Sequence, residues 1–275
     1  MAEPRVAEPH LNEARLSQPL FEYLPGDSPL LISFPHSGTY LPPELAARLL
    51  PQALDLPDTD WFVPQLYDFC RDLGASVIRA THSRYVIDLN RPPDGAPLYL
   101  GQRETTVCPT ISFDGERLYR GEDPCAAEIA LRLKTYWQPY HHKLEELTRE
   151  LRARHGSCIL WDAHSILSEV PGLFDGRLPD LNVGTASGRS CAAALAERIA
   201  ATLSAQKQFS FVVNGRFKGG YITRHYGNPA AGINAVQMEI AQSAYLAEAR
   251  VPVFDAVRAK PLRTLLCSLF KDVTR

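Results

Sequence analysis

The segment "PLLISFPHSGTYLPPEL", residues 29–45, decides the fold class. Residues 30–34, which are apolar except for Ser33, are typical of a strand buried on both faces of a parallel sheet. The polar turn "PHSG", residues 35–38, follows the run directly, and residues 43–50 are expected to form a helix. A buried strand, a polar turn and a helix in this order predict an α/β protein with functional residues at the strand end.

The same alternation of short apolar runs and longer amphipathic stretches continues along the chain. We expect strands over residues 30–34, 76–80, 85–89, 158–162, 209–213 and 235–240, and helices over residues 43–50, 61–73, 126–155, 188–203 and 254–271. Pro139 is expected to kink or interrupt the longest helix. Strands that alternate with helices predict a three-layer α/β/α sandwich with a mixed, mostly parallel sheet.

The length of the chain favours one domain over residues 1–275. Residues 1–28 are expected to form an N-terminal extension ahead of the first strand. Residues 92–123 are rich in Pro and Gly and predict a long irregular excursion, with a hairpin around residues 113–116. Loops of this length in a compact domain often act as lids or binding loops.

Composition narrows the class of partner. The chain has 29 Lys and Arg against 31 Asp and Glu, so no overall field favours nucleic acid or an anionic membrane. Its 6 cysteines show no CxxC spacing, which is typical of reduced thiols in a cytosolic protein. No apolar run approaches the roughly 18 residues of a membrane helix. We expect a cytoplasmic protein with a small-molecule substrate, and the sequence leaves its oligomeric state open.

Polar side chains follow or end several predicted strands. His36 follows the first, Asn90 and Arg91 follow residues 85–89, His164 comes just after residues 158–162, and Glu239 lies near the end of residues 235–240. Each has a structural interpretation when taken alone, as a hydrogen-bonded core histidine, a cap or a solvent-facing carboxylate. Because ligands bind at the carboxyl ends of strands in α/β sheets, we expect these side chains to share one active site.

Two imidazoles and one carboxylate around a divalent ion, with a fourth position for water, form the ordinary catalytic zinc site. A separate glutamate can then act as general base. Asp58 and Asp60, in "LPDTDWF", are both candidates for the carboxylate ligand. They directly precede a predicted helix, and either could instead cap it, so one aspartate could cap the helix while the other binds the metal.

Other hydrolytic chemistries fit less well. Ser37 and Ser165 lie beside histidines, but consecutive residues of a strand point to opposite faces, and no GxSxG elbow is present. Cys158 begins a predicted core strand and is expected to be inert. No GxGxxG or GxxxxGK[ST] pattern indicates a nucleotide site.

Several motifs, in this order, resemble the N-formylglutamate amidohydrolase family: "PLLISFPHSGTYLP", "DTDWFVPQLYDF", "SRYVIDLNRPPDGAPLY", "LWDAHSI", "LPDLNVGT" and "VNGRFKGGYITRHYGNPAAGINAVQMEIAQSAYL". The similarity runs from Pro29 to Leu246. It implies a phosphorylase/hydrolase-like fold akin to the zinc carboxypeptidases. It also implies metal-dependent hydrolysis of N-formyl-L-glutamate to formate and L-glutamate, the closing step of one route of histidine degradation.

The resemblance also implies roles for individual residues. His36 and His164 match the histidine ligands of the metal, Asp60 looks like the carboxylate ligand, and Glu239 resembles the general base. The carboxypeptidase motif HxxE would place a glutamate at Thr39, so the chain departs from that pattern. Zn²⁺ is the expected cofactor, although a two-His, one-carboxylate set accepts other divalent ions.

Substrate binding is expected to involve arginines, because N-formylglutamate carries two carboxylates. The Asn90-Arg91 pair looks like the Asn-Arg pair that binds the substrate α-carboxylate in zinc carboxypeptidases. Arg84 and Arg224 are further candidates. Arg224 lies in "FKGGYITRHYGNP", residues 217–229, which we expect to be a tightly turning loop that approaches a ligand.

Two alternatives to this function stay open. A zinc amidohydrolase of the same fold could act on another N-acyl acidic amino acid or on a cell-wall-type amide. The second alternative is a binding protein of the same fold without catalytic activity. It is disfavoured because both histidines, a carboxylate and a candidate base are all present.

Overall fold

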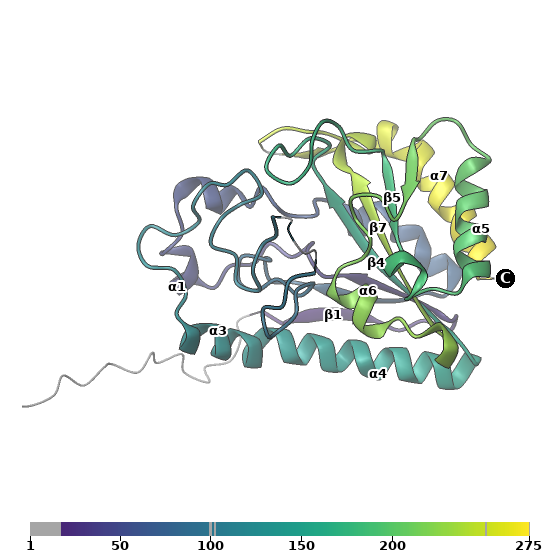
Figure 1. Ribbon diagram of the computed structural model, residues 1–275, viewed down its shortest axis with the longest axis horizontal. Coiled ribbons are helices and arrows are strands. Elements are labelled where there is room, and N and C mark those ends of the chain that lie inside the picture. Colours follow the sequence, from purple (N-terminus) through teal and green to yellow (C-terminus); the bar gives the residue numbers. More distant parts are fainter. Residues whose placement is uncertain (1–17, 99–100, 102, 251, 275) are drawn as a thin grey trace, which may run out of the picture.

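The computed structural model describes residues 18–98, 101, 103–250 and 252–274. A seven-stranded sheet runs through the described part in the order β1-β3-β2-β4-β7-β5-β6 (Figure 1). Its strands are β1 (Phe21–Leu24), β2 (Leu30–Phe34), β3 (Ser76–Ala80), β4 (Cys158–Ile166), β5 (Leu181–Gly184), β6 (Phe211–Val213) and β7 (Ile233–Ala241). β1 and β5 pair antiparallel with β3 and β7, and the other neighbours pair parallel. The predicted mixed, mostly parallel sheet is confirmed.

Helices cover both faces of this sheet. The longest are α4 (Gln138–His155), α5 (Ala193–Ser204) and α7 (Ala256–Val273). The shorter α-helices are α1 (Pro43–Ala46), α2 (Val63–Leu66), α3 (Ala126–Arg132) and α6 (Tyr221–Tyr226). Single turns of other types are η1 (Pro51–Asp55), η2 (Asp68–Leu73), η3 (Leu133–Trp137), η4 (Ala186–Gly188), η5 (Pro229–Ala231) and η6 (Gln242–Ala244). A small hairpin joins β8 (Leu246–Ala247) to β9 (Val253–Phe254).

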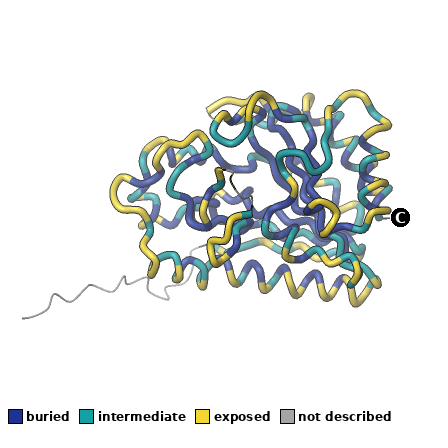
Figure 2. The backbone as a smooth tube through the Cα atoms, viewed as in Figure 1, coloured by how far each residue is buried: buried dark blue, intermediate teal, exposed yellow. Residues whose placement is uncertain are grey.

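Alternation along the central strands explains the three layers. Ile32 of β2 and Trp161 of β4 pack into the core beneath α5 and α7. Their neighbours Leu31 and Leu160 pack into the opposite core, against α4. Both faces of these two strands are buried, so apolar residues dominate their sequence up to the polar residues that reach the site. Figure 2 shows the result, since the central strands are buried whereas α4 alternates between buried and exposed positions.

The predicted strand over residues 85–89 is wrong, because these residues form turns and irregular structure. Their backbone N–H groups bond locally or to a loop instead of to a neighbouring strand. The N–H of Tyr85 donates to Ser83 Oγ at 3.2 Å, that of Val86 donates to the Ser83 carbonyl at 2.9 Å, and that of Asp88 donates to the Val107 carbonyl at 2.7 Å. Short polar side chains that capture the local backbone compete with a sheet ladder. Asn90 and Arg91 therefore lie in a turn and do not follow a strand.

The remaining differences concern boundaries and short elements. The π-turn η3 separates α3 from α4 just before Pro139, where an interruption was expected. The predicted helix over residues 61–73 divides into α2 and η2, and the predicted helix over residues 43–50 ends early, at Ala46. The sequence patterns missed β1, β5 and α6. β1 lies within the predicted N-terminal extension, of which residues 1–17 fall outside the described residues.

The described residues of the excursion over residues 92–123 form no named helix or strand, and Ile111 and Arg117 pair as an antiparallel bridge. The Ser112 N–H donates to the Glu116 carbonyl at 2.9 Å across the predicted hairpin. Among the described helices, none has both the length and the apolar character needed to cross a membrane.

Candidate active site

Strands β2, β4 and β7 bring the central polar residues together. His36 lies two residues beyond the end of β2, and His164 and Glu239 are paired residues of the parallel strands β4 and β7. Paired residues of parallel strands point to the same face of a sheet. β4 continues to Ile166, so His164 lies inside the strand and does not follow it as predicted.

His36, Asp60 and His164 form a buried group that could hold a metal ion, with one donor atom of each within 4.8 Å of the others. The Asp60 N–H donates to the His36 carbonyl at 3.1 Å, which holds the Asp60 loop against the end of β2. Asp60 Oδ2 lies 2.9 Å from His164 Nδ1 and 3.9 Å from His36 Nδ1. Asp58, the alternative ligand, lies outside this group, and its carboxylate accepts from the Phe113 N–H at 3.1 Å.

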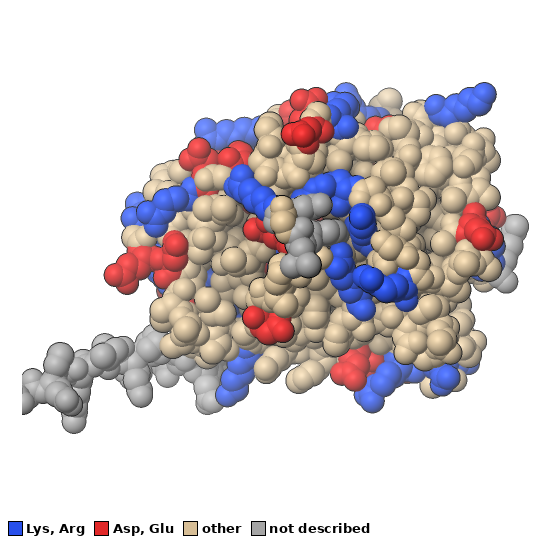
Figure 3. Space-filling model, in the orientation of Figure 1, with Lys and Arg blue, Asp and Glu red and all other residues tan. Residues whose placement is uncertain are grey.

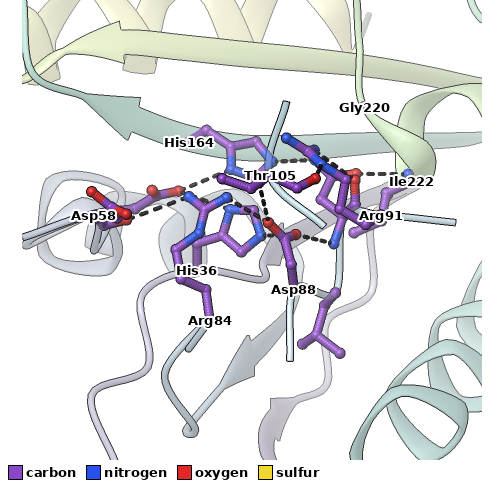
Figure 4. Close-up of polar contacts among 12 residues, drawn as sticks. His36, Asp58, Arg84, Asp88, Arg91, Thr105, His164, Gly220 and Ile222 are labelled. Carbon is purple, nitrogen blue, oxygen red and sulfur yellow. Dashed lines mark hydrogen bonds and ion pairs between the residues drawn. The ribbon is translucent and has the colours of Figure 1, made fainter. Parts of the chain in front are cut away.

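The orientation of His36 suits a metal ligand. Its Nε2 lies 2.7 Å from Oδ1 of the fully buried Asp88 (Figure 4). An ionised carboxylate only accepts hydrogen bonds, so Nε2 carries the proton and Nδ1 presents its lone pair toward Asp60. Asp88 also accepts from Arg84 Nη2 at 2.6 Å. The pattern of residues did not predict this role of Asp88.

Two polar side chains lie beside Nε2 of His164. This nitrogen is 3.0 Å from Asp162 Oδ2 and 2.9 Å from Asn90 Nδ2, and Asn90 Nδ2 also donates to Asp162 Oδ2 at 3.0 Å. Nδ1 of His164 lies 2.9 Å from Asp60 Oδ2. Asp162 and His164 are two residues apart in one strand and share a face, a spacing from which this contact could have been predicted. Two imidazoles, each oriented by a carboxylate, and one further carboxylate fit a divalent metal ion.

Burial and neighbouring charges shift the pKa values of several residues in this cluster. Burial disfavours the ionised form of Asp88, but the Arg84 guanidinium and His36 outweigh it and hold the pKa of Asp88 well below its usual range. Burial, aided by the charge of Arg84, lowers the pKa of His36. Burial also opposes protonation of His164, but Asp162 and Asp60 together raise its pKa well above the usual range. Asp88 thus stays ionised as a fixed acceptor for His36.

Glu239 is 7% exposed and lies beside the metal-ligand group. Its Oε2 accepts from Gln237 Nε2 at 3.1 Å, and Gln237 Oε1 accepts from the Gly220 N–H at 2.7 Å. Burial raises the pKa of Glu239 to about 8, while His164 lowers it and Asp60 raises it. A carboxyl group that titrates near neutral pH can both accept and return a proton.

One cavity reaches these groups. It is lined by seven of the residues predicted for the site: His36, Asp60, Arg84, Asn90, Arg91, His164 and Glu239. Two arginines that the sequence patterns did not single out, Arg103 and Arg216, also line it. Lys and Arg side chains gather around the middle of the face shown in Figure 3.

The predicted arginines differ in their contacts. Arg84 is buried and its charge is paired with Asp88. Arg91 is oriented by backbone carbonyls, since its Nε donates to Thr105 at 2.9 Å and its Nη1 donates to Asn90 at 3.1 Å (Figure 4). Arg224 does not line the cavity, and its Nε and Nη1 donate to backbone carbonyls at 2.8 and 2.7 Å.

The segment over residues 217–229 contains helix α6 and is therefore not only a loop. Oδ1 of Asn90 accepts from the Ile222 N–H at 2.8 Å in the first turn of α6. A Cβ at Gly220 would clash with the Asn90 side chain, so the glycine lets α6 approach Asn90 closely. The amide of Asn90 is thus engaged at both ends, by Asp162 and by α6.

Comparisons with known proteins agree with this arrangement. Residues 28–246 match the family described as N-formylglutamate amidohydrolase. The chain is 49% identical to the N-formylglutamate deformylase of Pseudomonas putida, over 90% of this chain and 92% of that protein. It is also 49% identical to the N-formylglutamate deformylase of Pseudomonas aeruginosa, over 90% of this chain and 93% of that protein.

Two solved structures share the fold. One is the crystal structure of an N-formylglutamate amidohydrolase from Ralstonia eutropha JMP134, with a TM-score of 0.77 and 24% identity over 92% of this chain and 96% of that one. The other is a protein of Agrobacterium tumefaciens, with a TM-score of 0.71 and 18% identity over 93% of this chain and 96% of that one. By the extent of its sequence match, the chain belongs to the N-formylglutamate amidohydrolase family.

Proposed function

We propose that the protein hydrolyses N-formyl-L-glutamate to formate and L-glutamate, using a divalent metal ion held by His36, Asp60 and His164. The observation that carries the proposal is this buried group, which lies in one cavity with Glu239. The identity to two N-formylglutamate deformylases supports the choice of substrate.

Zn²⁺ is the proposed metal, because two imidazoles and one carboxylate form a common catalytic zinc site. A divalent ion bound there would polarise the formyl carbonyl and lower the pKa of water at the site. Asp88 and Asp162 hold the two imidazoles so that both Nδ1 atoms face Asp60. Carboxylates that hold the other nitrogen of a histidine ligand in this way orient the imidazole for a metal ion.

Glu239 is the proposed catalytic base. It takes a proton from the water that attacks the formyl carbon, and it returns this proton to the nitrogen of glutamate as the C–N bond breaks. The hydroxyl oxygen stays with the formyl carbon, which leaves as formate. The position of Glu239 supports this role, because it lies in one cavity with His36, Asp60 and His164 and is the residue paired with His164 across β4 and β7.

Arg91 is the proposed partner of the substrate α-carboxylate. Its contacts to the carbonyls of Thr105 and Asn90 orient the guanidinium without neutralising its charge. Asn90 fixes the position of Arg91 and links it to the metal-ligand group through Asp162. We assign Arg84, whose charge is paired with Asp88, to holding the His36–Asp88 contact.

The direct test is formate release from N-formyl-L-glutamate by chelator-stripped protein, with and without one equivalent of zinc. Metal content is measured separately. N-acetylglutamate and N-formylaspartate serve as comparison substrates. We expect zinc to bind and to restore turnover of N-formylglutamate above both comparisons. Zinc binding with faster turnover of another N-acyl amino acid would refute the substrate, and a failure to bind any divalent metal would refute the ligand set.

A further inference from the structure

Arg216 lies in the segment between β6 and α6 and lines the active-site cavity. Its Nε donates to the Leu173 carbonyl at 2.9 Å, and its guanidinium carbon lies 5.3 Å from the centre of the Phe217 ring. A backbone carbonyl and an aromatic ring are contacts that orient a guanidinium.

Arg103 reaches the same place from a different part of the chain, the excursion over residues 92–123. Its Nη2 donates to the Ser112 carbonyl at 3.4 Å. Its guanidinium lies so close to Gly172 that a Cβ there would clash with Nη1. Gly172 and Leu173 are consecutive residues, so the guanidinium groups of Arg103 and Arg216 both lie against the same turn of the chain.

The turn over residues 170–174, here called the platform, is held in shape by its own backbone hydrogen bonds. The N–H groups of Leu173 and Phe174 both donate to the Val170 carbonyl, at 2.8 and 3.1 Å. Val170 is buried in a small apolar cluster with Ile166, which is the last residue of β4. The platform is thus attached to the strand that carries His164.

Arg91 and the pair Arg103 and Arg216 line the cavity from different parts of the chain, and Glu104 lines it as well. Arg91 is adjacent to Asn90, whose amide contacts the carboxylate beside His164. Arg103 and Arg216 lie instead beside the turn beyond the end of β4. Leu173 and Phe217 also line the cavity. Arginines from two parts of the chain, next to apolar groups, suit a short substrate with a carboxylate at each end.

We propose that Arg103 and Arg216 jointly bind the side-chain carboxylate of the substrate and thereby select N-formyl amino acids that carry a second negative charge. The inference rests on the proposed function and deepens it, because it assigns the selectivity to two named residues. The competing role is structural, in which the two arginines only tie their loops to the turn over residues 170–174. The two roles differ in their dependence on substrate charge.

The test compares two substrates of nearly equal shape, N-formyl-L-glutamate and N-formyl-L-glutamine, with the zinc-loaded protein. Arg216→Met and Arg103→Met are each expected to lower kcat/KM for N-formylglutamate about 10- to 100-fold, the range for a lost hydrogen bond to a charged group. Turnover of N-formylglutamine should change less than about 3-fold, because its amide does not form the charged contact. Arg216→Lys keeps the positive charge but lacks the planar guanidinium. Its kcat/KM for N-formylglutamate should therefore lie between the values for the parent protein and for Arg216→Met.

Arg152→Met is the matched control. Nε of Arg152 also donates to a backbone carbonyl, that of Ala231 at 3.1 Å, but this arginine is exposed and does not line the cavity. Arg152→Met should leave kcat/KM for N-formylglutamate and for N-formylglutamine unchanged. If Arg103 and Arg216 bind one carboxylate, their effects should not be independent. The fold-decrease in kcat/KM for N-formylglutamate in the double variant should then be smaller than the product of the fold-decreases in the two single variants.

Equal losses on both substrates in the Arg103 and Arg216 variants would overturn the proposal in favour of the structural role. Unchanged selectivity in both variants would also overturn it. Thermal unfolding of each variant identifies a folding defect, and in that case Arg216→Lys carries the test.

A failure of the proposed function is recognised separately, because the parent protein would then release no formate from N-formylglutamate. The binding of glutarate and butyrate, followed by calorimetry, still tests the arginine pair in that case. A preference for the dianion glutarate that Arg216→Met abolishes supports the pair. The absence of any such preference in the parent protein refutes it.

Discussion

His164 of β4 and Glu239 of β7 are directly paired residues of two adjacent parallel strands. Their side chains leave the sheet on the same face, so the geometry of the sheet places the candidate base beside a candidate metal ligand. Asp60 and His36 complete the group from the loop before α2 and from the end of β2. Proton transfer and metal binding can therefore be separated by mutation.

Glu239→Gln should retain the metal and lose turnover. The amide has nearly the same shape but cannot accept the proton of the attacking water, so kcat should fall by about 10²- to 10⁴-fold, the usual contribution of general acid–base catalysis. Zinc content by atomic emission and formate release measure the two properties. A variant with normal zinc content and near-parental turnover would exclude Glu239 as the base.

Asp60→Asn should bind zinc much more weakly than the parent protein, because it removes the one anionic donor of the group His36, Asp60 and His164. Asp58→Asn is the matched control two residues away. The carboxylate of Asp58 accepts from the Phe113 N–H, and an asparagine oxygen can do the same. Competition with a chromophoric chelator gives both affinities. Loss of zinc in Asp58→Asn with retention in Asp60→Asn would reverse the assignment of the ligand.

Asp88→Asn and Asp162→Asn should each weaken zinc binding by about 10- to 100-fold, the usual effect of removing a carboxylate that orients a histidine ligand. Asp88 holds Nε2 of His36 at 2.7 Å, and Asp162 holds Nε2 of His164 at 3.0 Å. Chelator competition on the two variants measures the change. Parental affinity in both would show that the two imidazoles are held in place by other contacts.

His141 should make the metal-free protein less stable in acid. Burial lowers the pKa of His141 from 6.5 to about 3. Its Nε2 lies 2.9 Å from the Leu89 carbonyl, and its ring stacks on Trp137 at 3.7 Å. Below pH 6.5 the unfolded chain binds a proton at this residue that the folded protein excludes. Stability contributed by the neutral ring is thus complete above pH 6.5 and is lost as the pH falls toward 3.

The measurement is the free energy of unfolding in urea at pH 7.5 and at pH 5, for the parent protein and for His141→Gln. The slope from one such group is at most about 1.4 kcal/mol per pH unit. His82, whose pKa burial lowers to about 4, is present in both proteins, so its contribution cancels. An equal pH dependence in both proteins would show that His141 is not the source.

The sequence predicted the parts of the fold that depend on local pattern. Residues 30–34 and 76–80 form β2 and β3 with the expected bounds, because their short, largely apolar runs suit strands inside a covered sheet. Residues 85–89 have a similar apolar content but form no strand, because their backbone N–H groups bond to Ser83 and to the Val107 carbonyl instead of to a neighbouring strand. Which partner a backbone N–H finds depends on the arrangement of the side chains around it.

The same division holds for the site. The residue types and the family motifs were sufficient to predict His36, Asp60, His164 and Glu239 as members of one site, and the cavity contains all four. Only the tertiary structure pairs Asp88 with His36 and brings Arg103 and Arg216 to one turn. Motif and periodicity are properties of neighbouring residues, whereas these contacts depend on loops that are distant in the chain and meet only when the sheet has formed.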